Sequence, residues 1–371
     1  MAFADQKRHR GLRFLRDDKV REANGNGKTA VARIAVIVVS WNDSAEVEAC
    51  IEALSAARRR AAPAGPEVSL VLVDNGGHLG ERERIRSLWP DARWIVNERN
   101  RGLAPAANQG AAAAHGDVLL FVNPDTRAEG DPYTQLSLAF AHGPKVVAVA
   151  PRLLEESGSA NGASRRLAPP DREDQFTFQL RRLPALVSDA RHLLLIDHLW
   201  PNNAGRRRER YADFDREVPF AVEQAAGAAL AVRRDAFVAA GGFDERFTPA
   251  WFEDVDLCDR LAREGTILYW PHARFRHAGG TSSRQLGYAR LLPIFYRNAL
   301  RYRQRYSPWA RLIYRVLLAT GMVLRLVALP FRPHVPRPRG EAARGYLRTL
   351  AVALGSTARE SSDSLGSRLS A

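Results

Sequence analysis

The chain has 371 residues, and its shares of hydrophobic residues (46%) and charged residues (26%) are close to those of globular proteins. These values exclude a wholly disordered chain, a collagen-like repeat and a multispan membrane protein. Lys and Arg number 55 against 41 Asp and Glu, which gives a formal net charge of +14 and favours anionic partners. The two cysteines, Cys50 and Cys258, exclude a disulfide scaffold.

Residues 1–32 are polar and charged and are typical of a mobile leader. They lack the apolar core that follows the charges of a secretory signal. We therefore expect a cytoplasmic protein whose fold begins at Arg33.

The stretch from residue 33 to residue 122 predicts alternating strands and helices. The run over 33–40 is β-branched, as expected for a strand buried on both faces. After it we expect a helix with a buried stripe formed by Val47, Cys50, Ile51 and Leu54. The next expected elements are a strand over 68–73, a helix over 84–88, a short strand over 93–96, an alanine-rich helix over 104–114 and a strand over 118–122. This alternation predicts an α/β fold with a mostly parallel central sheet flanked by helices.

The pattern weakens in the middle of the chain. A strand is expected over 145–150, and long loops with short helices over 155–217. Regular structure then returns as a segment over 227–233, helices over 234–240 and 254–264, and a strand over 266–270.

The C-terminal part is helical, aromatic and basic. Between Thr281 and Gly340 there is no Asp or Glu, whereas Arg stands at 284, 290, 297, 301, 303, 305, 311, 315, 325, 332, 337 and 339. The apolar run over 312–331 is interrupted by Arg315 and Arg325. Because an Arg at the centre of a membrane span costs about 2.5–3.5 kcal/mol, we expect an interfacial helix rather than a span. The Ser- and Gly-rich tail from Gly355 is expected to be disordered.

Two polar turns follow predicted parallel strands, where such sheets bind their ligands. Asp74 follows the strand over 68–73 and is either a turn residue or a contact for a nucleotide base or ribose. The turn Asn123-Pro124-Asp125-Thr126 follows the strand over 118–122. Its carboxylate, Asp125, is placed to ligate Mg²⁺ or Mn²⁺, and a plain polar turn is the alternative.

Two further groups are candidates for chemistry. Glu253 and Asp254 follow Trp251 and Phe252, so they are either dipole partners in a first helical turn or partly desolvated carboxylates suited to general base catalysis. His277 precedes two glycines and two hydroxyl residues and is either structural or a ligand for a metal or a phosphate. Asp256 and Arg260 are expected to pair along the helix.

The order of these motifs resembles the family 2 glycosyltransferases, and most of all their rhamnosyltransferase-like branch. The resemblance covers residues 33–285 and rests on eight segments: SWN (40–42), VDNGG (73–77), NRGLAPAANQG (100–110), NPDT (123–126), GAALAVRR (227–234), GGFDERF (241–247), EDVDLCDR (253–260) and HAGGTS (277–282). It implies a GT-A fold and an inverting transfer of a sugar from a nucleotide diphosphate donor to an acceptor hydroxyl.

The resemblance also implies roles for single residues. The nucleotide-sugar pocket would be lined by Ser40, Asn42, Asp74, Asn108, Asn123 and Asp125. Asp125, with His277, would hold the metal on the diphosphate, and Asp254, with Glu253 beside it, would deprotonate the acceptor. Asn123 replaces the first carboxylate of the Asp-x-Asp that many members carry; this favours dTDP-L-rhamnose as donor and leaves weaker metal dependence open.

The domain organisation follows from the resemblance. Residues 33–126 form the nucleotide-binding half and residues 127–285 the acceptor half, where Trp251, Phe252, Arg165 and Arg166 would face a glycan or lipid-linked glycan. Residues 286–340 form a basic amphipathic extension, and 341–371 a C-terminal helix with a tail. Through residues 288–331 the protein would bind an anionic membrane surface, on the inner face of the plasma membrane, and extend a cell-envelope glycan.

Other interpretations stay open. The donor could be another sugar nucleotide such as a UDP-hexose, or the chain could bind a nucleotide sugar without catalysis. A nucleic-acid-binding role would suit the Arg-rich helices with interleaved Tyr, but it leaves the ordered acidic motifs without a purpose, so we expect no nucleic acid. The acceptor, the linkage and a homo-oligomeric state are not determined by the sequence.

Overall fold

The structure is a computed structural model that describes residues 31–41, 44–76, 79–80, 82–143, 145–155, 175–279, 287–331 and 338–355. Several sequence predictions fall on other residues and so lie outside the described part: the leader, Asn42, Arg165, Arg166, the end of the HAGGTS motif and the tail.

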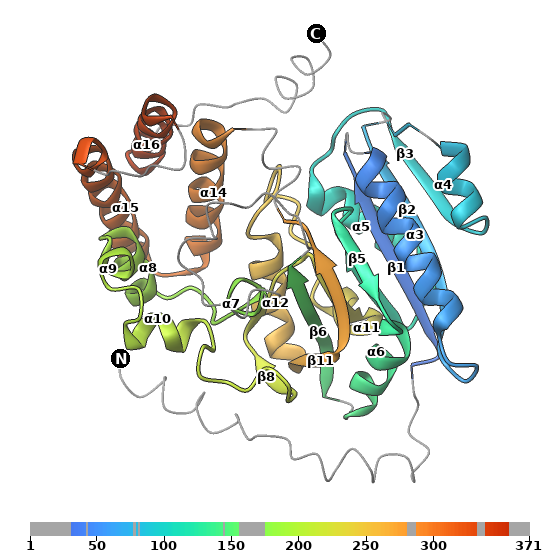
Figure 1. Ribbon diagram of the computed structural model, residues 1–371. Helices are drawn as coiled ribbons and strands as arrows, with labels where there is room; N and C mark the ends of the chain where they lie inside the picture. Colours follow the sequence, from blue (N-terminus) through green and yellow to red (C-terminus); the bar gives the residue numbers. More distant parts are fainter. Residues whose placement is uncertain are drawn as a thin grey trace.

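Within the described residues the central sheet has nine strands in the order β3-β2-β1-β4-β10-β6-β11-β5, with β8 paired to β11 (Figure 1). Strands β10, β5 and β8 run antiparallel to their neighbours, and the other pairings are parallel. The predicted mostly parallel sheet is therefore confirmed. The strands are β1 (Arg33–Ser40), β2 (Glu67–Asn75), β3 (Arg93–Asn97), β4 (Val118–Val122), β5 (Thr126–Glu129), β6 (Val146–Glu155), β8 (Phe220–Val222), β10 (Ala229–Arg233) and β11 (Thr266–His277).

Helices cover both faces of this sheet. One face packs against α3 (Ser44–Arg60), α4 (Arg82–Leu88) and α6 (Pro132–Ala141), and the other against α5 (Leu103–Ala113), α11 (Arg234–Ala239) and α12 (Glu253–Glu264). The predicted stripe of α3 is buried. Helix α5 lies so close to the sheet that a Cβ on Gly110 would stand 2.5 Å from Ile37 Cγ2, which explains its run of small residues.

The middle of the chain forms short helices, as expected: α7 (Phe176–Gln179), α8 (Leu186–Leu193), α9 (Ile196–Leu199) and α10 (Ala204–Glu209). A second, two-stranded sheet pairs β7 (Leu180–Arg181) with β9 (Gln224–Ala225).

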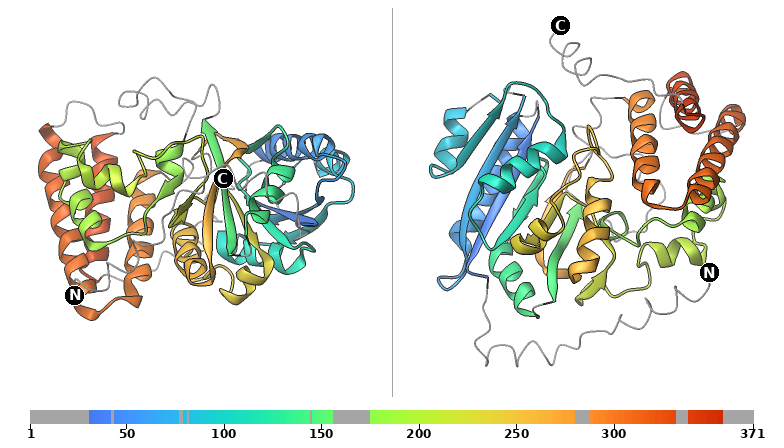
Figure 2. Two further views of the ribbon diagram at one scale, coloured as in Figure 1. Left: turned by 90° about the horizontal axis from the view of Figure 1, so that it is seen from below. Right: turned by 180° about the vertical axis from the view of Figure 1, so that it is seen from behind.

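The C-terminal helices form a third layer beside the sheet domain (Figure 2). They are α14 (Tyr288–Tyr302), α15 (Pro308–Ala328) and α16 (Arg339–Ala353), with the 3₁₀ turns η2 (Arg303–Arg305) and η3 (Leu329–Phe331). Their core also takes in α8 and the residues from Phe247 to Val255, so this layer is joined to the segment that precedes α12.

Helix α15 and its continuation, Pro308–Phe331, are long and apolar enough to cross a membrane by length and composition alone, and 28% of the tested stretch is buried. Ser307 caps the helix by accepting a hydrogen bond from Ala310 N. The two arginines that interrupt the apolar run bind neighbouring backbone: Arg315 donates to Ala353 O, and Arg325 donates to Leu193 O.

Two stretches of the sheet differ from the sequence prediction. Strand β5 begins at Thr126, where a polar turn was expected, and β11 continues to His277 instead of ending at Trp270. Pro271 and a register shift after Trp270 hide the continuation, although the next residues alternate between buried and exposed as a strand requires.

Candidate functional site

The carboxyl ends of β1, β2 and β4 meet at one edge of the sheet and bring together the residues predicted for the nucleotide pocket. Ser40 lies opposite Asp74 in the pairing of β1 with β2, and Val38 lies opposite Val122, directly before Asn123. The Ser40 hydroxyl is buried and has no hydrogen-bond partner in the described part of the chain. A buried donor of this kind is free to bind a ligand.

Asp74 is 2% exposed, and its carboxylate already has protein partners. Arg82 Nη2 lies 2.8 Å from Asp74 Oδ2, and Leu79 N donates to the same oxygen at 3.4 Å. The structure thus ties the end of β2 to the start of α4. A nucleotide contact for Asp74 remains a prediction, and it would have to include Arg82.

A network of amides that sequence reasoning missed shapes the loop beside Asp74. Asn75 Nδ2 donates to Asn100 Oδ1 (3.0 Å) and to Gly102 O (3.1 Å), and Asn97 Nδ2 donates to Asn75 Oδ1 (3.0 Å). Gln109 of α5 bonds Asn97 in both directions. The sequence signal was the recurrence of Asn and Gln around two strand ends, where buried amides usually hydrogen-bond one another.

Asp125 and His277, the two residues predicted to bind a metal, are brought together by strand β5 and the end of strand β11. The sequence pattern predicted neither β5 nor this end of β11. Thr126 of β5 pairs with His277 of β11, which places Asp125 Oδ1 3.3 Å from His277 Nε2. Both side chains are buried, and Gln175 holds the imidazole with Oε1 2.9 Å from Nδ1. In the described residues no group of three or more His, Cys, Asp or Glu is placed to hold a metal ion, so the protein offers these two donors.

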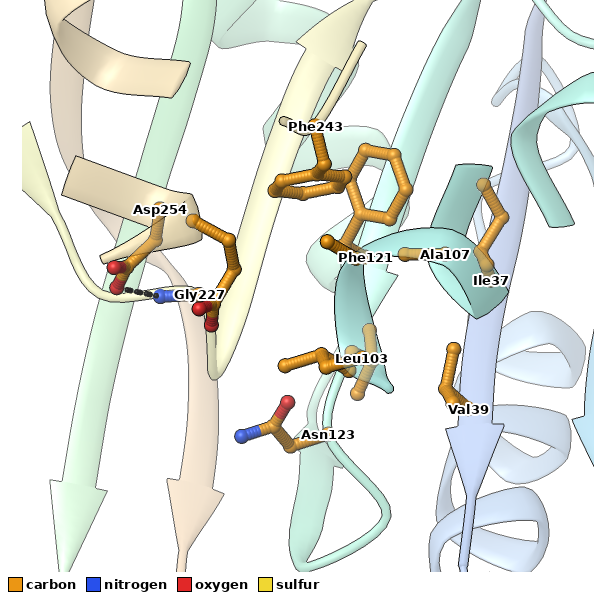
Figure 3. Close-up of a pocket in the computed structure, with 12 residues that line it drawn as sticks. Ile37, Val39, Leu103, Ala107, Phe121, Asn123, Gly227, Phe243 and Asp254 are labelled. Carbon is orange, nitrogen blue, oxygen red and sulfur yellow. Dashed lines mark hydrogen bonds between the residues drawn. The ribbon is translucent and has the colours of Figure 1, made fainter. Parts of the chain in front are cut away.

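Glu253 and Asp254 line a cavity of about 30 Å³, room for about one water molecule, at the start of α12. Figure 3 shows Asp254 and Gly227 on one side of the cavity, with Leu103 and Ile37 beyond it. Gly227 N donates to Asp254 Oδ2 at 3.1 Å, whereas Glu253 Oε2 is buried and has no hydrogen-bond partner among the residues that the structure describes. A cavity of this size has no room for a nucleotide or a sugar ring.

Burial changes the acidity of both carboxyls. It raises the pKa of Glu253 to about 8, to which the charge of Asp254 contributes. Burial also raises the pKa of Asp254, against hydrogen bonds from Gly227 N and Val255 N that stabilise its charge. Asp254 is the better place for a negative charge on this pair, because its oxygens accept backbone hydrogen bonds.

The two residues before this pair adopt left-handed backbone conformations, with φ of 74° at Trp251 and 73° at Phe252. Such conformations cost free energy in residues with side chains and are concentrated at functional sites. Asn298 of α14, fully buried, donates to Ala250 O (2.9 Å) and Trp251 O (3.1 Å) and so holds the loop in place.

Of the two residues expected on the acceptor side, Phe252 is 6% exposed and packs against Phe295 and Tyr302 of the C-terminal layer. Trp251 is half-buried and packs against the same cluster. Their side chains thus anchor the loop that carries Glu253 and Asp254, and an acceptor contact for them remains a prediction.

Asn108, predicted near the nucleotide, connects α5 to the loop after α11. Its Nδ2 donates to Phe243 O and its Oδ1 accepts from Phe243 N, both at 2.9 Å. Gly242 beside it has φ +70°, and a Cβ there would meet Asn108 Oδ1 at 2.9 Å, so only glycine fits.

The expected ion pair between Asp256 and Arg260 is present, at 2.6 Å.

A short loop links the metal pair to the acidic pair. Asn123 N donates to Ala228 O at 2.9 Å and Thr126 Oγ1 donates to the same carbonyl at 3.3 Å, while the preceding Gly227 N binds Asp254. One rigid unit therefore presents a carboxylate that can accept a proton and, beside it, a carboxylate and an imidazole that can bind a hard cation.

A family model described as glycosyl transferase family 2 matches residues 35–211. Over these residues the chain is similar to glycosyltransferase family 2. It is 27% identical over 307 residues to the N-acetylglucosaminyl-diphospho-decaprenol L-rhamnosyltransferase of two Mycobacterium tuberculosis strains, CDC 1551 / Oshkosh and ATCC 25618 / H37Rv, an alignment covering 79% of this chain and 91% of the relative.

The solved structures confirm the GT-A fold. The crystal structure of GalNAc-T7 with UDP, GalNAc and Mn²⁺ superposes with a TM-score of 0.51 at 15% sequence identity and covers 89% of this chain. The chain spans 57% of that longer protein, so the likeness concerns the fold alone. The chain thus has the α/β architecture that the sequence predicted, with C-terminal helices added to it.

Proposed function

We propose that this glycosyltransferase moves L-rhamnose from dTDP-L-rhamnose to a hydroxyl of a lipid-linked cell-envelope glycan, with inversion at the sugar. One observation supports this type of reaction: hydrogen bonds of Gly227 and Ala228 connect the Glu253–Asp254 pair to the turn that holds the Asp125–His277 pair. The donor and the acceptor class are supported by the mycobacterial relative, whose name states an L-rhamnosyl transfer to a diphospho-decaprenol glycan.

Asp254 acts as the general base in this proposal. An inverting displacement needs a group that removes the proton of the acceptor hydroxyl as the new bond forms. The carboxylate of Asp254 is fixed by Gly227 N and Val255 N, and protonated Glu253 beside it adds no second charge below about pH 8. The burial that raises the pKa of Asp254 also makes it a stronger base.

Asp125 and His277 fit a divalent cation, because a carboxylate and an imidazole within 3.3 Å of each other suit Mg²⁺ or Mn²⁺. When bound, the ion would neutralise charge on the diphosphate that leaves the sugar. The Mn²⁺ named with GalNAc-T7 is consistent with such an ion on this fold. Asn123 adds an uncharged amide at the same turn, so the protein contributes a single negative charge there.

The C-terminal layer suits a location on the inner face of the plasma membrane. Exposed apolar side chains follow one face of α15 and its continuation: Trp309, Leu312, Ile313, Val316, Val323, Leu324, Val327 and Phe331. Their spacing is that of a helix lying in an interface. Arg315 and Arg325 hydrogen-bond within the helical layer, which favours attachment to the surface over a span.

A donor screen with matched variants tests the proposal. Binding of dTDP-L-rhamnose, UDP-galactose, UDP-N-acetylglucosamine and GDP-mannose is measured by calorimetry with and without Mn²⁺, and rhamnosyl transfer is then followed. Asp254→Asn should retain donor binding and lose transfer by about 10²–10⁴-fold, as expected when a general base is removed. Asp91→Asn, which removes the same charge from an exposed pair with Arg58, is the control.

The outcomes separate the parts of the proposal. Selective binding of a uridine or guanosine donor would show that the donor is not dTDP-L-rhamnose, and it would leave the proposed type of reaction unchanged. Undiminished transfer in Asp254→Asn would remove the assigned base, and binding without any transfer or donor hydrolysis would indicate a nucleotide-sugar-binding protein.

A further inference from the structure

The two-stranded ribbon β7–β9 brings a basic side chain to the acidic pair. Arg181 lies opposite Gln224 in this ribbon, and Ala226 N donates to Gln179 O at 2.9 Å. The next residue is Gly227, which binds Asp254. Burial, the largest effect, lowers the pKa of Arg181, whereas the negative charges of Glu209 and then Asp254 raise it.

Arg181 has no carboxylate of its own. No ion pair joins it to any acid in the described residues, and its Nε is buried without a hydrogen-bond partner. Its guanidinium lies 5.6 Å from the ring centroid of Phe178. The ring of Phe178, 53% exposed, stacks in turn on His277, with centroids 6.5 Å apart and planes inclined by 23°. Phe178 therefore connects Arg181 to His277 by one ring contact on each side.

Two more arginines, Arg206 in α10 and Arg210 at its end, lie close to this ribbon, because Arg182 N donates to Glu209 O at 2.8 Å. Burial is the largest cause that lowers the pKa of Arg210 to about 10, and the charges of Arg181 and Arg206 also lower it. Neither Arg206 nor Arg210 has an ion-pair partner among the described residues; Arg206 donates to Asp197 O at 2.8 Å. Mutual repulsion of partly buried cations costs free energy in the free protein, and a bound anion removes that cost.

The nearby acids are already engaged. Glu209 pairs with Arg191 at 2.5 Å, and Asp197 Oδ1 accepts from Asn203 Nδ2 at 2.8 Å. We name Arg181, Arg206 and Arg210 the arginine cluster. Phe178 contacts both Arg181 of this cluster and His277.

We propose that the arginine cluster binds the diphosphate of a lipid-linked acceptor. This inference rests on the proposed function. A glycan joined to a lipid through a diphosphate carries its negative charge about one sugar ring away from the hydroxyls of its first sugar. A hydroxyl placed at Asp254 would thus leave the diphosphate near Arg181, where guanidinium groups can bind its oxygens with paired hydrogen bonds.

The test compares two phosphate-bearing ligands on the full-length protein. Farnesyl diphosphate in detergent is the probe for the acceptor side and dTDP the probe for the donor side, with inorganic pyrophosphate as a third arm. Arg181→Gln and Arg210→Gln should each weaken farnesyl diphosphate binding about tenfold or more, the usual value of a lost charge-assisted hydrogen bond, and leave dTDP binding unchanged. Arg181→Lys, which retains the charge, should recover part of the loss.

Arg208→Gln is the matched control, since it removes one exposed positive charge from α10, the helix of Arg206, and should change neither affinity. Equal loss of dTDP and farnesyl diphosphate binding in Arg181→Gln would place the cluster on the donor side and overturn the proposal. Unchanged farnesyl diphosphate affinity in both cluster variants would also overturn it, as would pyrophosphate binding as tight as that of the lipid with no dependence on Arg181.

The test also separates this inference from the proposed function. Wild-type protein that binds no nucleoside diphosphate under any metal condition contradicts the transferase proposal, whatever the lipid result. If Arg181→Gln melts at a much lower temperature than wild type, Arg210→Gln decides the question, because that side chain lies outside the β7–β9 ribbon.

Discussion

At the scale of single residues, the unusual feature is a pair of adjacent carboxyls at the start of α12, the buried Glu253 and the half-buried Asp254. An unfolded Glu253 titrates near pH 4.5, whereas burial raises its folded pKa to about 8. Between these values the unfolded chain has lost the proton that the folded chain keeps, so the free energy of unfolding falls as the pH rises and levels off above about pH 8. The folded state is thus destabilised by Glu253 at neutral pH.

Glu253→Gln should remove this dependence, because an amide has no proton to lose in this range. The variant is expected to gain stability relative to wild type steadily from about pH 5 to about pH 8. Urea unfolding at four or five pH values measures it, with Glu217→Gln at an exposed position as control. Parallel stability curves for the variant and wild type would show that Glu253 is charged in the folded protein.

Asn108 is a second residue whose role can be measured. Its amide both donates to and accepts from the backbone of Phe243. Asn108→Ala should lower the free energy of unfolding by about 2 kcal/mol, roughly the value of two hydrogen bonds. Asn108→Asp should be less stable still at neutral pH, because a carboxylate would face Phe243 O and Glu245 without a donor.

Thermal unfolding and donor calorimetry together decide between a structural and a binding role for Asn108. Unchanged donor affinity in Asn108→Ala, measured well below its melting temperature, would make it a structural residue. A loss of donor affinity with unchanged stability would instead support the nucleotide contact expected from the sequence.

At the scale of elements, α14 positions the loop that precedes the acidic pair. Asn298→Ala would leave the carbonyl groups of Ala250 and Trp251 without their donor in a buried place. We expect kcat to fall about tenfold or more while the KM for the donor changes little, because the base moves and the nucleotide edge does not. Asn298→Asp should behave alike, since it keeps the shape but cannot donate.

Steady-state kinetics with Arg290→Gln, an exposed charge on the same helix, provides the control. Equal changes in kcat and in donor KM, or full activity in Asn298→Asp, would show that α14 does not act through these hydrogen bonds.

The elements also show how far the sequence predicts this molecule. β1, β2, β4, α3 and α5 follow from local periodicity, and the rule for the carboxyl ends of parallel strands places Ser40, Asp74 and Asn123 at one edge. The contact between Asp125 and His277 depends on pairing between β5 and the end of β11. Such pairing joins residues far apart in the chain, and Pro271 interrupts the local signal, so only the family resemblance suggested it.

At the scale of the whole molecule, the structure changes the meaning of the basic C-terminal stretch. Several of its arginines bind partners inside the protein: Arg301 donates to Asn298, Arg303 to Asp189, Arg305 to Asp259, Arg315 to Ala353 and Arg325 to Leu193. These cations hold the helical layer to the sheet domain or cap helix ends. They are therefore not available as free charges for an anionic surface.

Membrane attachment should then depend on the apolar face of α15 more than on charge. Val316→Glu combined with Val327→Glu removes two exposed apolar side chains, each worth about 1.5 kcal/mol or more when buried, so vesicle binding should fall at least about 50-fold. Binding of wild-type protein to zwitterionic vesicles should persist in about 0.5 M salt, where exposed charges are screened. Val238→Glu, an exposed valine on α11, is the control in a vesicle sedimentation assay. If vesicle binding requires anionic lipid and disappears with salt, the membrane attachment instead depends on the C-terminal arginines other than those that bind partners inside the protein.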